Sequence, residues 1–173
     1  MEQEIILTNE ECDWILQSAG EYHRGGITRD GETVEIDEMR TCYEFTFVDN
    51  EQLYALLFPK LQKFGIKSLP SDMTVVRYDK GQEFKAHLDR GVGHGDRIKT
   101  VSIQLSESSD YKGGDFIVMI RDEIQNVKTQ ELVNRDKGSV VIFESDLLHY
   151  VVEVLDGTRY ALVFWLKEEN LDI

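Results

Sequence analysis

The chain has 173 residues, of which 41% are hydrophobic and 10% aromatic, and this composition fits one globular domain with a sizeable core. Its 33 acidic and 19 basic residues give a formal net charge of −14, a sign that repels phosphate backbones and argues against a nucleic-acid partner. No apolar run is long enough to span a bilayer, and the acidic N-terminus lacks the basic start of a signal peptide. We therefore expect no membrane partner and a cytoplasmic location.

The first 70 residues are expected to form mainly helical support. One helix should begin at a Thr8 or Asn9 cap and end near Ala19. A second should begin at an Asn50 cap, and Pro59 should kink or divide it. Its apolar face comprises Leu53, Leu56, Leu57, Leu61 and Phe64.

Between these helices, residues 41–48 alternate like a strand, whereas residues 25–31 are rich in glycine and predict a mobile loop. The two cysteines, Cys12 and Cys42, form no C-x-x-C pair, and we interpret them as reduced, partly buried thiols.

From residue 73 onward, short apolar segments alternate with turn signals. Strands are predicted over residues 73–78, 101–105, 116–120, 139–143, 149–154 and 160–166. Turns are predicted at residues 79–81, 113–114, 136–138 and 156–157. Strands at this spacing are typical of a β-sandwich or barrel, so we expect a mainly β domain over residues 1–173, with flanking α-helices and a β core at about 73–167.

Three side chains in this core form a candidate metal site. His87 and Asp89 follow a strand-like segment, where residues two apart point to the same face. His149 begins a later apolar strand. Two histidines and one carboxylate on one face form the facial triad of non-haem iron(II) oxygenases, which leaves open positions for chemistry. A lone His-x-Asp pair more often means a surface contact, and a lone histidine is usually just hydrogen-bonded.

The remaining histidines and Arg159 are also compared with ordinary structural roles. His23 and His94 lie in polar, glycine-rich surroundings and are predicted to be loop residues, with His94 the nearest competitor as a ligand. Arg159 enters an almost wholly apolar run, where a guanidinium needs an anionic partner and can bind a carboxylate through two hydrogen bonds. Taken alone, Arg159 is better explained by an internal salt bridge to one of the many acidic residues of the chain.

In combination, these pieces resemble the prolyl 4-hydroxylase-like branch of the 2-oxoglutarate/iron(II) dioxygenases. The resemblance covers about residues 73–167, and the order and spacing of its motifs are more specific than any single motif. The segments that carry it are Val76–Asp89, Gly113–Phe116, Lys137–Ser139, His149–Val154 and Gly157–Leu162. It implies a double-stranded β-helix, also called a jelly roll, at the core of the domain.

The resemblance also implies roles for individual residues. His87, Asp89 and His149 would bind iron(II), while Arg159 and Tyr78 would hold 2-oxoglutarate, with ascorbate a candidate further cofactor. Trp165 stands where relatives often place an aromatic residue near the pocket, although a core tryptophan fits equally well. Gln104 replaces a tyrosine found in several relatives, which leaves one co-substrate contact open.

The resemblance implies hydroxylation of a prolyl residue in a peptide or protein, and other readings remain. A free amino acid or another small metabolite is an alternative substrate with the same chemistry. An oxygen-reporting hydroxylase of a partner protein would share the same site. Nucleic-acid dealkylases usually carry a second arginine six residues after the first, where this chain has Trp165. The last alternative is a barrel that binds a metal or sugar without turnover.

Overall fold

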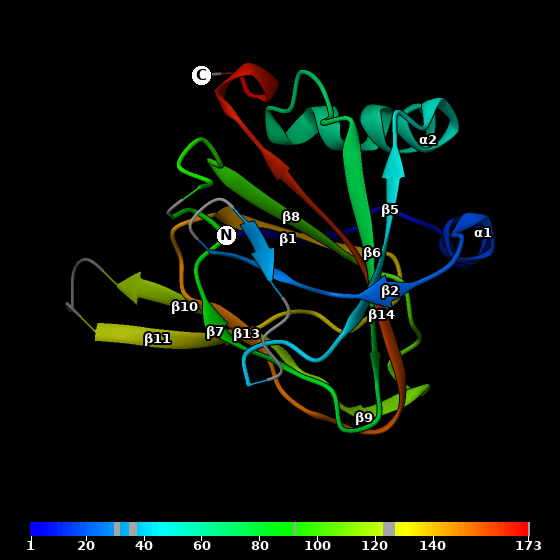
Figure 1. Cartoon of the computed structure of the whole chain (residues 1–173). Coiled ribbons are helices and arrows are strands. Elements are labelled where there is room, and N and C mark those ends of the chain that lie inside the picture. The colour runs from blue at the N-terminus through cyan, green and yellow to red at the C-terminus, as the bar shows by residue number, and fades with distance from the viewer. Residues whose placement is uncertain (30–31, 35–37, 92, 123–126, 173) are drawn as a thin grey trace.

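The computed structural model describes residues 1–29, 32–34, 38–91, 93–122 and 127–172. These residues form two large β-sheets, a small two-stranded sheet and helices outside the large sheets (Figure 1). The larger sheet has eight strands, in the order β1, β12, β8, β14, β6, β5 and β2, with β9 paired to β14. Their bounds are β1 Glu2–Ile5, β12 Ser139–Glu144, β8 Lys99–Gln104, β14 Val154–Leu166, β6 Asp72–Asp79, β5 Tyr43–Val48, β2 His23–Arg24 and β9 Tyr111–Gly113. Residues 1–70 therefore add strands to the main sheet as well as helices.

The smaller sheet has four antiparallel strands, in the order β11, β10, β13 and β7. Their bounds are β11 Val127–Leu132, β10 Phe116–Asp122, β13 His149–Val151 and β7 Phe84–His87. A separate two-stranded hairpin joins β3 Ile27–Arg29 to β4 Glu32–Val34. Two sheets packed in this way, with helices outside, form the jelly-roll architecture that was predicted.

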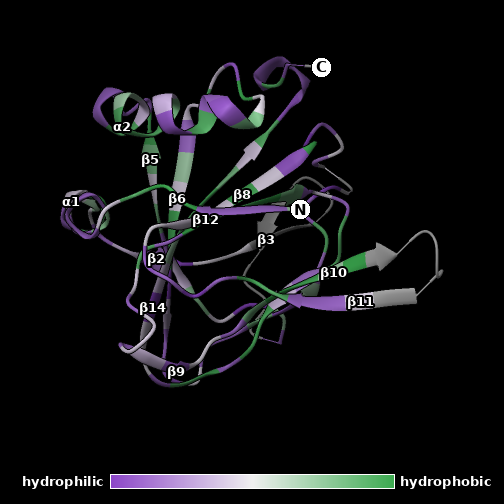
Figure 2. Ribbon diagram, turned by 180° about the vertical axis from the view of Figure 1, so that it is seen from behind, coloured by the Kyte–Doolittle hydropathy of each residue, from purple (hydrophilic) through white to green (hydrophobic). Residues whose placement is uncertain are grey.

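Two helices cover the outer side of the large sheet. They are α1 Asn9–Ser18 and α2 Glu51–Leu61, and short 3₁₀ turns follow at Gln62–Phe64 and Glu168–Asn170. Both caps are as predicted: Thr8 and Glu11 form a capping box, and the Asn50 side chain accepts a hydrogen bond from the backbone N–H of Leu53. In both views the helices lie away from the β10–β11 hairpin, and Figure 2 shows hydrophilic and hydrophobic residues mixed along each of them.

The alternation of side chains along the strands produces two separate cores. The first lies between the large sheet and the helices, and it includes Ile15, Leu57, Val75 and Phe164. The second lies between the two sheets. Its buried members include Val76, Tyr78, Phe116, Val118, Phe143 and Val151. The inner face of the large sheet, which faces the small sheet, therefore carries both apolar side chains and buried polar ones.

Several predictions about elements were wrong in detail. The helix α2 is not divided at Pro59 but continues to Leu61, and the loss of one backbone hydrogen bond at the proline does not end it. The turn predicted at residues 156–157 is instead a bend inside β14, where Gly157 has a φ of 75° and the register with β9 shifts. The strand predicted over residues 149–154 is divided, since β13 ends at Val151 and β14 begins at Val154.

The N-terminal loop prediction also needs correction. Residues 27–29 form strand β3, whereas residues 30 and 31 of the predicted loop lie outside the described part of the chain. His23 lies in the short strand β2, paired with β5, and not in a loop. Cys12 and Cys42 are free and buried, as expected. Within the described residues, no helix is both long and apolar enough to cross a membrane.

Candidate active site

The small sheet brings the predicted metal-binding residues together. His87 ends β7 and His149 begins β13, and the two residues are direct partners in the antiparallel register of these strands. Asp89 lies just beyond β7, where the backbone N–H groups of Asp89 and Arg90 both donate to the carbonyl of Ser145. The strand therefore ends before Asp89, and the hydrogen bonds to Ser145 direct the carboxylate toward the histidines.

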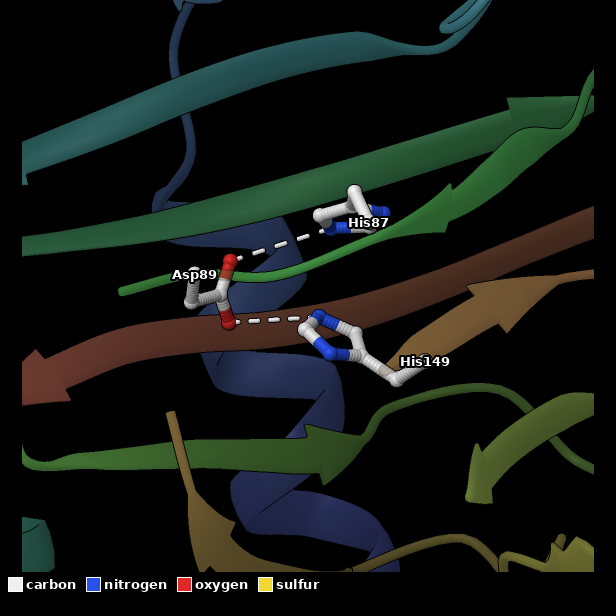
Figure 3. Close-up of side chains that lie close together, drawn as sticks. All are labelled: His87, Asp89 and His149. Carbon is white, nitrogen blue, oxygen red and sulfur yellow. Dashed lines mark ion pairs between the residues drawn. The ribbon is translucent and has the colours of Figure 1, made fainter. Parts of the chain in front are cut away.

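The three side chains point toward one another (Figure 3). The His87 Nε2 atom lies 3.7 Å from Asp89 Oδ1, and the His149 Nε2 atom lies 3.2 Å from Asp89 Oδ2. One potential ligand atom from each residue lies within 4.8 Å of the other two. Such spacing allows a single ion to contact all three.

Backbone carbonyls fix the tautomer of both histidines. His87 Nδ1 lies 2.7 Å from the carbonyl oxygen of Lys85, and His149 Nδ1 lies 2.9 Å from that of Leu147. A carbonyl can only accept, so each Nδ1 must carry the proton, and each Nε2 keeps its lone pair toward Asp89. Three electron-pair donors then face a common point, which is unfavourable without a cation between them. This donor set fits iron(II), with two imidazoles and one carboxylate.

The surroundings of the site keep it in the form that binds a metal. Burial and the neighbouring His149 ring lower the pKa of His87 to about 4, so the imidazole is neutral at neutral pH. Burial opposes ionisation of Asp89, but its polar neighbours, among them the donating Thr100 hydroxyl, hold its pKa well below the usual range. Thr100 Oγ1 donates to Asp89 Oδ2 at 2.7 Å and lies 3.0 Å from the Ser145 hydroxyl.

An aromatic stack supports the first histidine. The ring of Phe84 lies parallel to that of His87, with centroids 3.6 Å apart and an interplanar angle of 15°. The guanidinium carbon of Arg40 lies 4.7 Å from the centroid of the Phe84 ring. Arg40 is itself held by an ion pair to Glu44 at 2.7 Å. These contacts restrict the orientation of the imidazole.

Arg159 and Tyr78 lie next to each other on the inner face of the large sheet. They are paired in the β14–β6 register, and the guanidinium carbon is 5.6 Å from the Tyr78 ring and 5.9 Å from the Phe116 ring. Arg159 is only 4% exposed, and it has no hydrogen bond or ion pair to any residue in the described ranges. A buried cation without an anion is costly, so this position suits a ligand carboxylate.

One cavity of about 720 Å³ joins the metal-binding residues to Arg159 and Tyr78, and this volume is typical of small-molecule sites. Its walls come from both sheets. Trp165 also lines this cavity, whereas Gln104 does not and instead donates to the Ser106 carbonyl and the Tyr111 hydroxyl. His94 lines the cavity too, but it is not part of the metal-binding group.

Sequence reasoning missed several residues at this site: Arg40, Phe84, Arg97, Thr100 and Ser145. They lie far from the metal-binding residues in the chain or in unremarkable contexts, such as Thr100 inside an apolar strand. Of these, only Arg97, a cation at the end of a glycine-rich loop, gave a signal that could have been noticed.

Comparison with known proteins agrees with this geometry. A PKHD-type hydroxylase of Acinetobacter baumannii is 32% identical over 98 residues, which cover 53% of this chain and 40% of that protein. A prolyl-4-hydroxylase structure from Pseudomonas putida has a TM-score of 0.68 at 18% identity and covers 96% of this chain and 91% of its own. A Trichoplax adhaerens prolyl hydroxylase, solved with a peptide fragment of hypoxia inducible factor, has a TM-score of 0.70 at 18% identity over 92% and 76% of the two chains.

Residues 73–167 match the 2OG-Fe(II) oxygenase superfamily, and the chain belongs to that superfamily. The chemistry of this superfamily uses iron(II) and 2-oxoglutarate, and the two solved prolyl hydroxylases share the fold of this chain. The alignment with the Acinetobacter baumannii hydroxylase covers about 40% of the length of that protein.

Proposed function

We propose that this chain is an iron(II)- and 2-oxoglutarate-dependent hydroxylase that acts on a prolyl residue in a peptide or protein. The observation that carries the proposal is the presence, in one cavity, of a His-Asp-His group and a buried arginine with no acidic partner in the described residues. The choice of a prolyl substrate is supported by the relatives, two of which are prolyl hydroxylases by name.

In this proposal, His87, Asp89 and His149 hold iron(II), and Arg159 and Tyr78 hold 2-oxoglutarate. When both are bound, they reduce dioxygen, so that one oxygen atom enters a substrate C–H bond and 2-oxoglutarate becomes succinate and carbon dioxide. The Lys85 and Leu147 carbonyls keep both Nε2 lone pairs available.

The remaining residues orient and shield the co-substrate. Arg159 can donate two parallel hydrogen bonds to its distal carboxylate. Burial raises the pKa of Tyr78, so the phenol stays protonated and keeps an O–H to donate. Phe116 and Val151 line the cavity with apolar surface, which excludes water and strengthens these contacts.

The direct test is to incubate the protein with iron(II), ascorbate and 2-oxoglutarate, and to offer proline-rich peptides and free L-proline in parallel. Succinate formation together with the gain of one oxygen atom by a peptide, measured by mass spectrometry, is the expected result. Oxidation of free L-proline alone would instead indicate a metabolite enzyme. If neither is oxidised while succinate still forms, the prolyl assignment fails and the dioxygenase assignment stands.

A barrel that binds metal without turnover would form no succinate at all. The Asp89→Ala variant, prepared identically, is the control for contaminating iron chemistry, because it lacks the charged member of the metal-binding group.

A further inference from the structure

The cavity contains a second arginine that forms no ion pair within the described residues. Three arginines line the cavity: Arg40, Arg97 and Arg159. Arg40 is neutralised by Glu44 at 2.7 Å, and Arg159 is the proposed partner of 2-oxoglutarate. Arg97 has no carboxylate within ion-pair distance anywhere in the part of the chain that the structure describes.

The acids nearest to Arg97 are committed elsewhere. Asp89 faces the two histidines, and Asp96 pairs with Lys167 at 2.6 Å. Arg97 is half-buried and stacks on Trp165, with its guanidinium carbon 3.6 Å from the ring centroid. Its one hydrogen bond, to the backbone carbonyl of Asp89, is long, at 3.5 Å. The guanidinium therefore keeps most of its donors free beside a metal-binding residue.

Trp165 adds a second donor without an acceptor. Its indole Nε1 atom is buried and has no hydrogen-bond partner, and few buried polar atoms in folded proteins are left in this state. Trp165 and Arg97 both line the cavity. A guanidinium stacked on an indole ring offers N–H donors and no acceptor, and this suits a ligand group made only of acceptors, such as a carboxylate.

The charges of the loaded site favour the same kind of ligand. Iron(II) brings two positive charges, of which Asp89 offsets one. The dianion of 2-oxoglutarate brings two negative charges, of which Arg159 offsets one. The net positive charge at the iron site and the net negative charge on 2-oxoglutarate cancel each other. The positive charge of Arg97 then has no counter-charge in the loaded site. The other acid of the cavity wall, Asp72, is exposed at its rim and accepts a hydrogen bond from Ser71, so solvent screens its charge.

We propose that Arg97 and Trp165 bind a carboxylate on the substrate residue that is hydroxylated. This rests on the iron(II)- and 2-oxoglutarate-dependent hydroxylation proposed above and restricts the substrate residue to one with a free carboxylate. That residue is either the C-terminal prolyl residue of a peptide or free L-proline, because both present the same group next to the ring.

The test measures binding to the protein loaded with iron(II) and 2-oxoglutarate, without oxygen, by isothermal titration calorimetry. The probes are N-acetyl-L-proline and N-acetyl-L-prolinamide, which differ in the carboxylate alone. We expect the acid to bind about 10- to 100-fold more tightly than the amide, the range for hydrogen bonds to a charged group. Equal binding of acid and amide overturns the proposal, as does the absence of binding by the acid.

Variants locate the preference. Arg97→Gln should abolish it, and Trp165→Phe, which keeps a ring but removes the N–H, should reduce it. Arg90→Gln is the matched control, because Arg90 lies in the same loop, is exposed and loses the same charge. A preference that survives Arg97→Gln overturns the proposal. If that variant does not fold, the comparison of acid with amide in the parent protein still decides.

Two further measurements separate the sources of the ligand and the two proposals. Tighter binding of free L-proline than of N-acetyl-L-proline supports the free amino acid, and the reverse supports a peptide C-terminus. Succinate formation is assayed in parallel with oxygen and with the proline-rich peptides, free L-proline and N-acetyl-L-proline each offered as substrate. An acid preference without any succinate supports the subsite and refutes the proposed function, whereas succinate without an acid preference refutes the subsite alone.

Discussion

Replacing Arg159 with methionine should separate the role of this residue in binding from any role in folding. Arg159 is 4% exposed, and its only partners among the described residues are the Tyr78 and Phe116 rings. If it binds the distal carboxylate of 2-oxoglutarate, Arg159→Met leaves that carboxylate buried and unpaired. The loss is about 2–5 kcal/mol, by analogy with truncated charge pairs, or about 30-fold to several thousand-fold in affinity.

The effect on folding should have the opposite sign or be small. A buried charge without a counter-charge destabilises the folded state, and methionine has a similar length without the charge. Methionine cannot replace the cation–π attraction between Arg159 and the Tyr78 and Phe116 rings. The loss of this attraction costs about 0.5–2 kcal/mol and offsets part of the stability gained by removing the buried charge. We therefore expect the free energy of unfolding of the protein without co-substrate to stay the same or rise slightly.

The assay pairs calorimetric titration of 2-oxoglutarate with urea unfolding in its absence. In the parent protein, 2-oxoglutarate at 100 times its Kd should add about 2.7 kcal/mol of stability, and the variant should lose this gain. Iron affinity serves as the internal control and should not change. Two results would refute the reasoning: parental affinity for 2-oxoglutarate in Arg159→Met, or a large loss of stability without ligand, which would indicate a structural ion pair.

Four further substitutions have distinct expected outcomes. Asp89→Ala should remove most iron(II) binding and all succinate formation, and succinate formation at the parental rate would contradict the assignment. Thr100→Val should weaken iron(II) binding about 10- to 100-fold, because it removes the 2.7 Å hydrogen bond that orients Asp89, and an unchanged affinity in a metal titration would dismiss this role. Gly138→Ala should destabilise the fold by about 3 kcal/mol or more, because φ is 84° and the added methyl would overlap the Leu7 carbonyl. Gly65→Ala, at a φ of 73° in open space, should cost only about 1–2 kcal/mol, and equal unfolding midpoints for the two variants would contradict the difference.

Sequence patterns sufficed for features that depend on local chemistry. The caps at Thr8 and Asn50 and the strands β6, β8, β10 and β12 follow from side-chain periodicity and local hydrogen bonding. The grouping of His87, Asp89 and His149 was foreseen because ligand types and spacing restrict the alternatives. Their roles as ligands stay predictions.

Features that depend on distant contacts were not visible in the sequence. The strand β1 is acidic and largely exposed, and it is an edge strand held by backbone pairing to β12, so no alternation identifies it. The bend at Gly157 resembles a turn locally, and only pairing with β9 and β6 makes it part of one strand. Thr100 and Ser145 meet Asp89 from far along the chain, and no local pattern encodes such a contact.

The division of the site between two sheets has a mechanical consequence. The metal-binding group is mounted on β7 and β13 of the small sheet, whereas Tyr78 and Arg159 belong to β6 and β14 of the large one. A 2-oxoglutarate molecule that binds iron at one end and Arg159 at the other would connect the two sheets. Binding of iron(II) and 2-oxoglutarate should then slow amide hydrogen exchange in β7 and β13 more than in β1. Any change in the distance between the two sheets would change the angle at which the substrate approaches the metal.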